Sequence, residues 1–112
     1  MKRIANPYAP LFADIFGLRT EVTIYSKRRV KHPTLGFECE ALMFPVGFNK
    51  NKTHIIVLSK AYTGTLSKYL NCVAHEYVHA WQDENGYNTN HGEKSMFKPW
   101  ARYLKERYGL LI

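Results

Sequence analysis

The feature that most constrains the fold of this chain is an apolar stripe at helical spacing in its second half. From Leu66 onward, apolar residues recur at separations of three and four, which predicts an amphipathic helix packed on a core. Thr65 suits the N-cap and Gly86 suits the C-terminal end, so we expect this helix to span residues 66–85. The residues of the stripe are Leu66, Leu70, Val73, Ala74, Tyr77, Val78 and Trp81.

The rest of the chain predicts an α+β fold. Residues 8–18 place apolar side chains at helical spacing, which indicates a short N-terminal helix. Residues 21–26, 36–44 and 53–58 carry the β-branched and aromatic side chains that are typical of strands. We expect these three strands to form a small sheet, with the first two paired as a hairpin. A final helix begins somewhere in residues 93–98.

The final helix contains a proline, Pro99, which a helix tolerates only in its first turn. Gly109 is placed to follow its last turn. We therefore expect the N-terminal helix and the three-stranded sheet to pack on the helix at 66–85. His91 and the final helix would then close the other side of that helix.

Length and composition indicate one cytoplasmic domain covering residues 1–112. A chain of 112 residues with 46% hydrophobic residues can build one core but not two. No apolar run approaches the roughly 18 residues of a membrane-spanning helix, and Pro7 and Asp14 interrupt the start of the chain where a secretory signal would lie. Two cysteines, Cys39 and Cys72, are too few for a disulfide framework, which favours a reducing compartment.

The predicted central helix carries an H-E-x-x-H motif formed by His75, Glu76 and His79. Residues four apart lie one turn above each other on a helix, so both imidazoles can bind one ion. Glu76 is rotated by about 100° from His75, which places its carboxylate beside the open position of the metal. The motif therefore predicts two zinc ligands and a general base.

A catalytic zinc ion usually has three protein ligands and one water, so a third ligand is needed. His91 is the best candidate because a polar turn after the helix can return the chain to the pair. Glu93 is the alternative, in a site of two histidines and one glutamate, and Glu84 is a weaker one because it points away from the ligand edge. Cys72, one turn before His75, is a candidate for a fourth ligand that would close the site.

These residues resemble the SprT-like domain, the protease module of Spartan proteins. The metzincin pattern is excluded, because it requires glycine at position 82 and histidine at position 85. The resemblance covers residues 54–103. It is carried by a strand ending in Leu58-Ser59, the segment His75-Glu76-Tyr77-Val78-His79-Ala80-Trp81, the pair His91-Gly92, and Phe97-Lys98 at the start of the last helix.

The resemblance implies a zinc peptidase with ligands at His75, His79 and His91 and a base at Glu76, acting on DNA-bound proteins. One part of the family pattern is missing: many bacterial members add a zinc ribbon ligated by cysteines. Two cysteines cannot form such a ribbon, so the resemblance is to a minimal domain.

The chain is basic, with a formal net charge of +7, which favours polyanionic partners. Residues 27–33 form a basic segment that we expect to be an exposed turn and a candidate for phosphate contacts. Its cations are Lys27, Arg28, Arg29 and Lys31, and Lys50, Lys52 and Lys60 are further candidates elsewhere.

The sequence therefore predicts a zinc-dependent peptidase that binds a protein or peptide substrate. The alternative is a zinc-stabilised module that binds DNA or protein without catalysis, such as a vestigial protease or an anti-host effector. His32 and His54 have no partner at ligand spacing, and we expect them on the surface or in a strand. A group that stabilises the oxyanion cannot be selected from Arg102, Tyr103, Arg107 and Tyr108.

Overall fold

The longest element is the helix α2 (Leu66–Glu84), which packs against strands of the main sheet and against the other two helices. The computed structural model describes residues 1–48 and 51–112. The Thr65 side chain accepts a hydrogen bond from the Lys68 backbone N–H at 3.2 Å, as an N-cap does. Asn85 is the C-cap, and Gly86 follows it in a left-handed conformation with φ of 76°. The helix predicted for residues 66–85 is confirmed.

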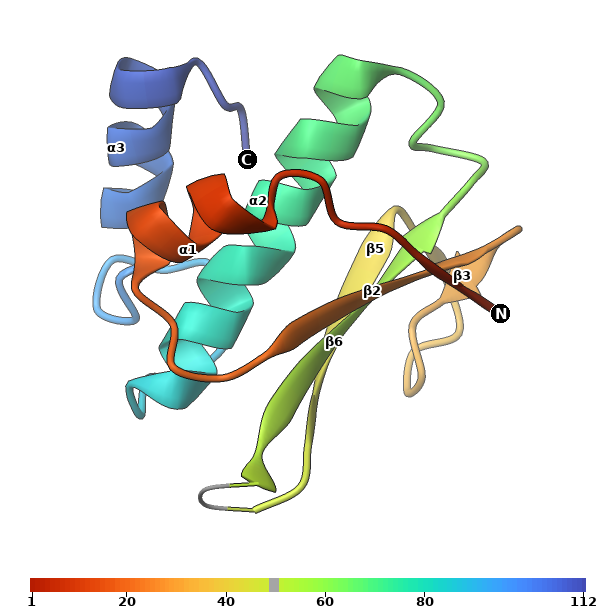
Figure 1. The fold of residues 1–112 in the computed structure, drawn as a ribbon, viewed down its shortest axis with the longest axis horizontal. Coiled ribbons are helices and arrows are strands. Elements are labelled where there is room, and N and C mark those ends of the chain that lie inside the picture. Colours follow the sequence, from red (N-terminus) through yellow and green to blue (C-terminus); the bar gives the residue numbers. More distant parts are fainter. Residues whose placement is uncertain (49–50) are drawn as a thin grey trace.

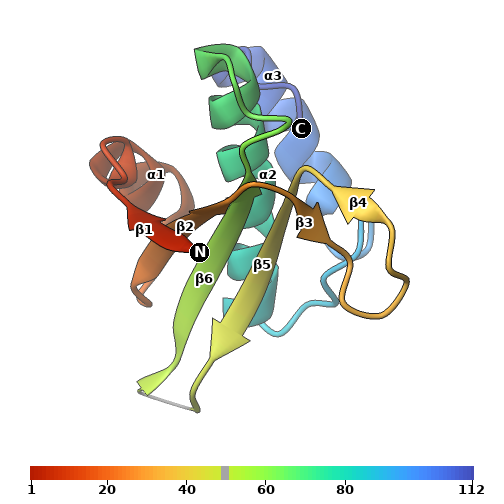
Figure 2. The same ribbon diagram turned by 90° about the vertical axis from the view of Figure 1, so that its right-hand side faces the viewer.

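A mixed four-stranded sheet lies against α2 in the order β1, β2, β6, β5 (Figure 2). Its strands are β1 (Lys2–Ile4), β2 (Val22–Lys27), β5 (Ala41–Val46) and β6 (Thr53–Ser59). The strand β6 pairs in parallel with β2 and antiparallel with β5, and β1 pairs antiparallel with β2. The predicted α+β class is confirmed, but the predicted three-stranded sheet is wrong in strand number.

The hairpin expected between residues 21–26 and 36–44 is also wrong. The second of these segments divides into β4 (Glu38–Cys39) and the first part of β5, and β4 pairs with the short strand β3 (Val30–Lys31) in a separate two-stranded sheet. The strand β6 separates β2 from β5 because it is the most buried strand and requires neighbours on both edges. The first strand was missed because it has only three residues, two of them cationic.

Two further helices pack on the side of α2 that faces away from the sheet (Figure 1). They are α1 (Ala9–Phe16) and α3 (Phe97–Tyr108), and both confirm the predicted terminal helices. Pro99 is the third residue of α3 and therefore lies in its first turn, as expected. Phe16 of α1 and Trp100 of α3 meet with ring centroids 4.7 Å apart, so the two helices also contact each other.

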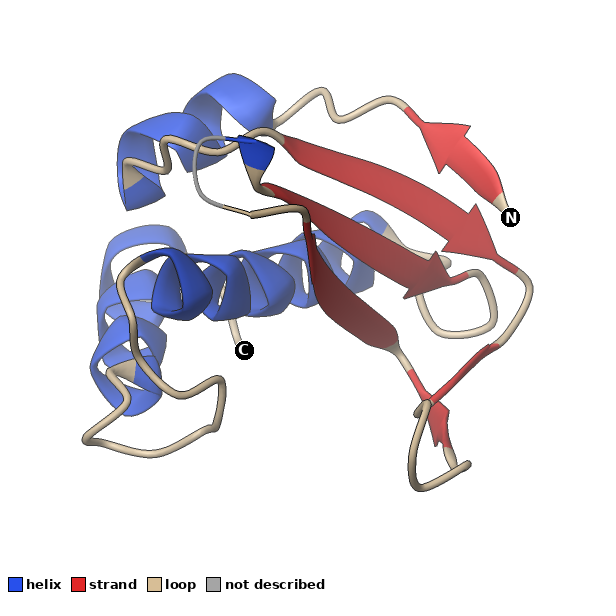
Figure 3. Ribbon diagram, turned by 90° about the horizontal axis from the view of Figure 1, so that it is seen from below, coloured by secondary structure: helices blue, strands red, loops and turns tan. Residues whose placement is uncertain are grey.

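The main hydrophobic core lies on both sides of α2, between that helix and the sheet and between that helix and the other two helices (Figure 3). This position makes α2 a rigid support for any side chain that it carries. The buried core residues are Phe12, Phe16, Ile24, Ile56, Leu58, Cys72, Val73, Ala74, Tyr77, Val78, Phe97 and Leu104.

The four cations of the basic segment at residues 27–33 are exposed, as expected, but part of the segment is strand rather than turn. Lys27 ends β2, and Val30 and Lys31 form β3, with the Val30 side chain buried at 4% exposure. Arg29 forms an ion pair with Glu38 at 3.0 Å. Of the other cations considered for phosphate contacts, Lys50 lies outside the described residues.

Among the helices of the described residues, none combines the length and the apolar character that crossing a membrane requires.

Candidate metal centre

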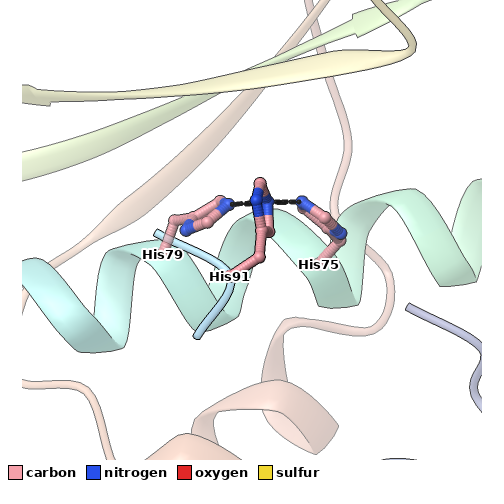
Figure 4. Close-up of side chains that lie close together, drawn as sticks. All are labelled: His75, His79 and His91. Atoms are coloured by element: carbon pink, nitrogen blue, oxygen red, sulfur yellow. Dashed lines mark hydrogen bonds between the residues drawn. The ribbon is translucent and has the colours of Figure 1, made fainter. Parts of the chain in front are cut away.

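Three histidine side chains from two segments converge on one point (Figure 4). His75 and His79 project from the same side of α2, and His91 comes from the loop between α2 and α3. The Nε2 atom of His79 lies 3.2 Å from those of His75 and His91, and the Nε2 atoms of His75 and His91 are 3.1 Å apart. The structure thus brings together the three residues predicted as ligands, in an arrangement that could hold a metal ion.

An aromatic side chain supports all three imidazoles. Phe97, the first residue of α3, is 5% exposed. Its ring centroid lies 4.9 Å from that of His75, 5.3 Å from that of His79 and 4.6 Å from that of His91. Because Phe97 packs against each ring, the start of α3 limits how far any of the three can rotate.

Gln82 connects His79 to the loop that carries His91. The fully buried Gln82 amide donates from Nε2 to the carbonyl oxygens of Asn90 at 2.8 Å and Ser95 at 3.1 Å. Its Oε1 atom lies 2.7 Å from Nδ1 of His79. With both amide hydrogens committed to carbonyl oxygens, Oε1 accepts a hydrogen bond, so Nδ1 of His79 is the donor.

His75 is oriented in the same way by the last residues of the chain. Its Nδ1 atom lies 3.1 Å from the backbone oxygen of Ile112, which can only accept a hydrogen bond. The neighbouring Leu111 N–H donates to the Asn71 side chain at 3.0 Å, which ties this segment back to α2. Ligand histidines in metal sites are usually held by such a contact to the second ring nitrogen.

These hydrogen bonds determine where the lone pairs of His75 and His79 point. A neutral imidazole that carries its proton on Nδ1 presents a lone pair at Nε2. The two Nε2 atoms face each other at 3.2 Å, and two lone pairs at that separation repel unless a cation lies between them. The hydrogen-bond network therefore prepares both rings to bind a cation.

Burial keeps both helix histidines in the neutral form that a metal requires. The pKa of His79 is lowered to about 4, mainly by desolvation; the Gln82 contact opposes this shift and the neighbouring imidazoles add to it. Desolvation also lowers the pKa of His75. No proton has to be removed from either ring at neutral pH before a metal ion binds.

Glu76, the predicted base, is 4% exposed and lines the same cleft as the three histidines. Desolvation raises the pKa of its carboxyl group to about 8. A buried carboxyl with such a pKa can hold a proton near neutral pH and release it when a positive charge is brought close.

The cleft has a volume of about 740 Å³ and lies between α2 and the edge strand β5. Residues Ala41 to Met43 of β5 form one wall, and residues of α2 from Lys68 to His79 form the floor. His91, Leu111 and Ile112 also line it. The cluster therefore lines a cleft that is open to solvent and large enough for a peptide segment.

The alternative ligands lie elsewhere or have other partners. Glu93 forms an ion pair with Arg102, including a contact of 3.2 Å between Oε2 and Nη2, and Glu84 accepts the backbone N–H groups of Arg19 and Thr20 at 2.9 Å. Cys72 lines the cleft, but its thiol donates to Glu40 at 3.4 Å and lies outside the cluster.

The two remaining histidines have structural contacts. His54 is fully buried in β6, where its ring nitrogens lie 2.7 Å from Thr20 Oγ1 and 2.8 Å from Asp83 Oδ2. His32 lines the cleft and accepts two backbone hydrogen bonds within its own loop. None of the residues considered for oxyanion stabilisation, Arg102, Tyr103, Arg107 and Tyr108, lines this cleft.

Sequence reasoning missed the residues that support the cluster. Gln82 stands three residues after His79, and this spacing on one helix face is a signal that could have identified it. The sequence predicts Phe97 at the start of the last helix and includes it in the SprT-like resemblance, but does not indicate its contact with the three imidazoles. The contact of Ile112 with His75 and that of Leu111 with Asn71 join positions 37 and 40 residues apart, respectively, and nothing in the local pattern indicates them.

No protein-family model, curated protein or solved structure matches this chain, so the comparisons assign it to no family.

Proposed function

We propose that this chain is a zinc-dependent peptidase, with His75, His79 and His91 as the metal ligands and Glu76 as the general base. The observation that carries the proposal is the mutual spacing of the three Nε2 atoms, 3.1 to 3.2 Å. Tetrahedral zinc with Zn–N bonds of 2.0–2.1 Å separates its nitrogen ligands by roughly 3.3 Å, so the donor set fits this ion. The resemblance to SprT-like domains supports the same activity.

Zinc, when bound, supplies a Lewis acid that polarises the scissile carbonyl and lowers the pKa of a coordinated water. The remaining chemistry belongs to Glu76. Its carboxylate takes a proton from the attacking water and passes the proton to the leaving amine. Its desolvated position supports this role, because a pKa near the working pH allows one group both to accept and to release a proton.

The free edge of β5 supports a peptide as the substrate. Ser59 N–H donates to the Glu40 oxygen at 2.9 Å, and hydrogen-bonded positions alternate along an antiparallel pair. Leu42 and Phe44 therefore bond to β6, whereas Ala41 and Met43 direct their N–H and C=O groups to the free edge. Both of these residues line the cleft, where an extended peptide can add as a further strand.

A cleavage assay tests the proposal. Zinc-loaded wild type is expected to cut an unfolded basic protein, and Glu76→Gln is expected to keep zinc and lose at least about 100-fold in rate, because the general base is removed. His79→Ala is expected to lose zinc and cleavage together. Equal cleavage by wild type and both variants would contradict the proposal. Zinc binding by wild type without cleavage, with or without single-stranded DNA, would favour the non-catalytic module instead.

A further inference from the structure

Apolar side chains line the same cleft as the histidine cluster. Phe37 belongs to the hairpin β3–β4, which projects on the β5 side of the molecule (Figure 2), and Leu111 belongs to the segment after α3. These side chains are 54% and 62% exposed. The apolar residues that line the cleft are Phe37, Ala41, Leu42, Met43, Leu111 and Ile112.

The ring of Phe37 is exposed but held in place. It stacks on His32, with ring centroids 5.2 Å apart and an interplanar angle of 24°. The His32 ring is itself fixed, because its Nδ1 accepts the backbone N–H groups of Thr34 at 3.2 Å and Leu35 at 3.0 Å. The loop closes through the His32 N–H, which donates to the Phe37 oxygen at 2.8 Å, and through Gly36, whose φ of 75° favours glycine.

The backbone at Leu111 is also held in place, by contacts with α2 and with the hydrophobic core. Its N–H donates to the Asn71 side chain of α2, and its neighbours Leu110 and Ile112 pack against the hydrophobic core. With the backbone fixed on both sides, little conformational freedom is lost when a ligand covers the exposed Leu111 side chain. Both apolar groups are thus preorganised for contact before any substrate arrives.

Apart from Glu76 and the histidines, the charged side chains that line the cleft are Glu40 and Lys68, which compensate each other. Glu40 and Lys68 pair with each other at 3.3 Å. Glu40 also accepts from the Cys72 thiol, so its second oxygen has a partner as well. A substrate side chain in this cleft would therefore contact mainly apolar groups.

We propose that Phe37 and Leu111 form an apolar subsite that selects extended peptides carrying a large apolar side chain in the bound segment. This inference rests on the proposed peptidase function, because it assigns the specificity of the same cleft. Covering such a side chain removes apolar area from water on both partners. The expected discrimination between phenylalanine and alanine at one peptide position is about tenfold or more.

Peptides that differ at one position test this subsite. Four short unstructured peptides carry Phe, Leu, Ala or Lys at the same central position in an otherwise polar sequence. Their kcat/KM values are measured with zinc-loaded wild type, and their dissociation constants with zinc-loaded Glu76→Gln. The Phe and Leu peptides are expected to exceed the Ala and Lys peptides by about tenfold in both measurements.

Variants assign the preference to the two residues. Phe37→Ala and Leu111→Ala are each expected to reduce the Phe-to-Ala ratio to about threefold or less, mainly through a higher KM, because the lost contact is made in the ground state as well. Leu35→Ala is the matched control: Leu35 is 69% exposed on the same hairpin but does not line the cleft. This control is expected to keep the wild-type ratio.

The outcomes separate this inference from the proposed function. Cleavage by wild type without any apolar preference would overturn the subsite and leave the peptidase intact. Apolar-selective binding to Glu76→Gln, without cleavage by wild type, would support the subsite and contradict the peptidase. An unchanged ratio in both Phe37→Ala and Leu111→Ala would also overturn the subsite. If Phe37→Ala fails to fold, Leu111→Ala and the wild-type ratio decide the question.

Discussion

Burial changes the acid–base behaviour of Glu76. In the metal-free protein, burial raises the pKa of its carboxyl group from 4.5 to about 8. The folded state therefore holds a proton on Glu76 that the unfolded chain releases above pH 4.5. Below pH 4.5 the carboxyl group is protonated in both the folded and the unfolded protein, so its burial causes no pH-dependent loss of stability. As the pH rises from 4.5 toward 8, only the unfolded chain releases the proton, and the metal-free protein loses stability.

Replacing Glu76 with glutamine should remove that loss. Between pH 4.5 and 7, the free energy of unfolding of metal-free wild type is expected to fall relative to metal-free Glu76→Gln by on the order of 3 kcal/mol. Chemical denaturation of both proteins in the presence of a chelator, at several pH values, measures the difference. Parallel pH dependences for the two proteins would show that Glu76 is not desolvated as described.

At this scale the sequence predicted the three histidines that the structure brings together, but not the residues that hold them. A helix fixes the relative position of residues four apart, so His75 and His79 follow from their spacing alone. The prediction of His91 required an assumption about where the loop after α2 runs. In the structure, His91 lies beside the pair. The Ile112 contact to His75 depends on tertiary packing, which local patterns do not encode.

Among the elements, the edge strand β5 combines two roles. It pairs with β6 on one side and offers free backbone groups to the cleft on the other. Pro45 shows how the strand tolerates a residue without an N–H group: in the register with His54, its nitrogen faces the free edge and no bond to β6 is lost. Neighbouring positions of β5 differ in the same way in the direction of their N–H groups, and proline substitutions can test this difference.

Proline at Ala41 should weaken peptide binding without unfolding the protein. Ala41→Pro removes an N–H that faces the free edge, so the dissociation constant of a bound peptide is expected to rise about two- to tenfold at a nearly unchanged Tm. Leu42→Pro removes an N–H that bonds to β6 and is expected to cost about 3 kcal/mol or more of stability. Thermal melts and peptide titrations of both variants provide the comparison. Wild-type peptide affinity in a folded Ala41→Pro protein would exclude the free edge as a binding element.

The helices were predictable and the strand order was not, for one physical reason. The backbone hydrogen bonds of α1, α2 and α3 join residues four apart, and the apolar face that each helix packs on the core repeats at the same spacing, so each helix is visible in its own segment of sequence. The strands, in contrast, bond to strands from other segments of the chain, and which strands pair depends on the packing of the whole core. Their β-branched and aromatic side chains mark β2 and β5 as strands, but only the burial of β6 on both faces places it between them.

Across the whole molecule, the candidate centre joins parts of the chain that are distant in sequence. His75 and His79 come from α2, His91 from the following loop, and the Ile112 backbone orients His75 from beyond α3. A metal ion bound to the three histidines would therefore link α2 to the loop and, through His75, to the last residues of the chain. The metal is the assumption on which the proposed peptidase and its subsite both depend.

Metal analysis of the purified protein tests that assumption most directly. Wild type and Glu76→Gln are expected to retain about one zinc ion per chain, and His79→Ala and His91→Ala to retain little, because a site with two histidines binds far more weakly. Glu93→Ala is the matched control, since Glu93 pairs with Arg102 and is expected to keep full zinc. A wild type without bound zinc, or a His91→Ala protein that retains it while Glu93→Ala loses it, would contradict the three-histidine centre.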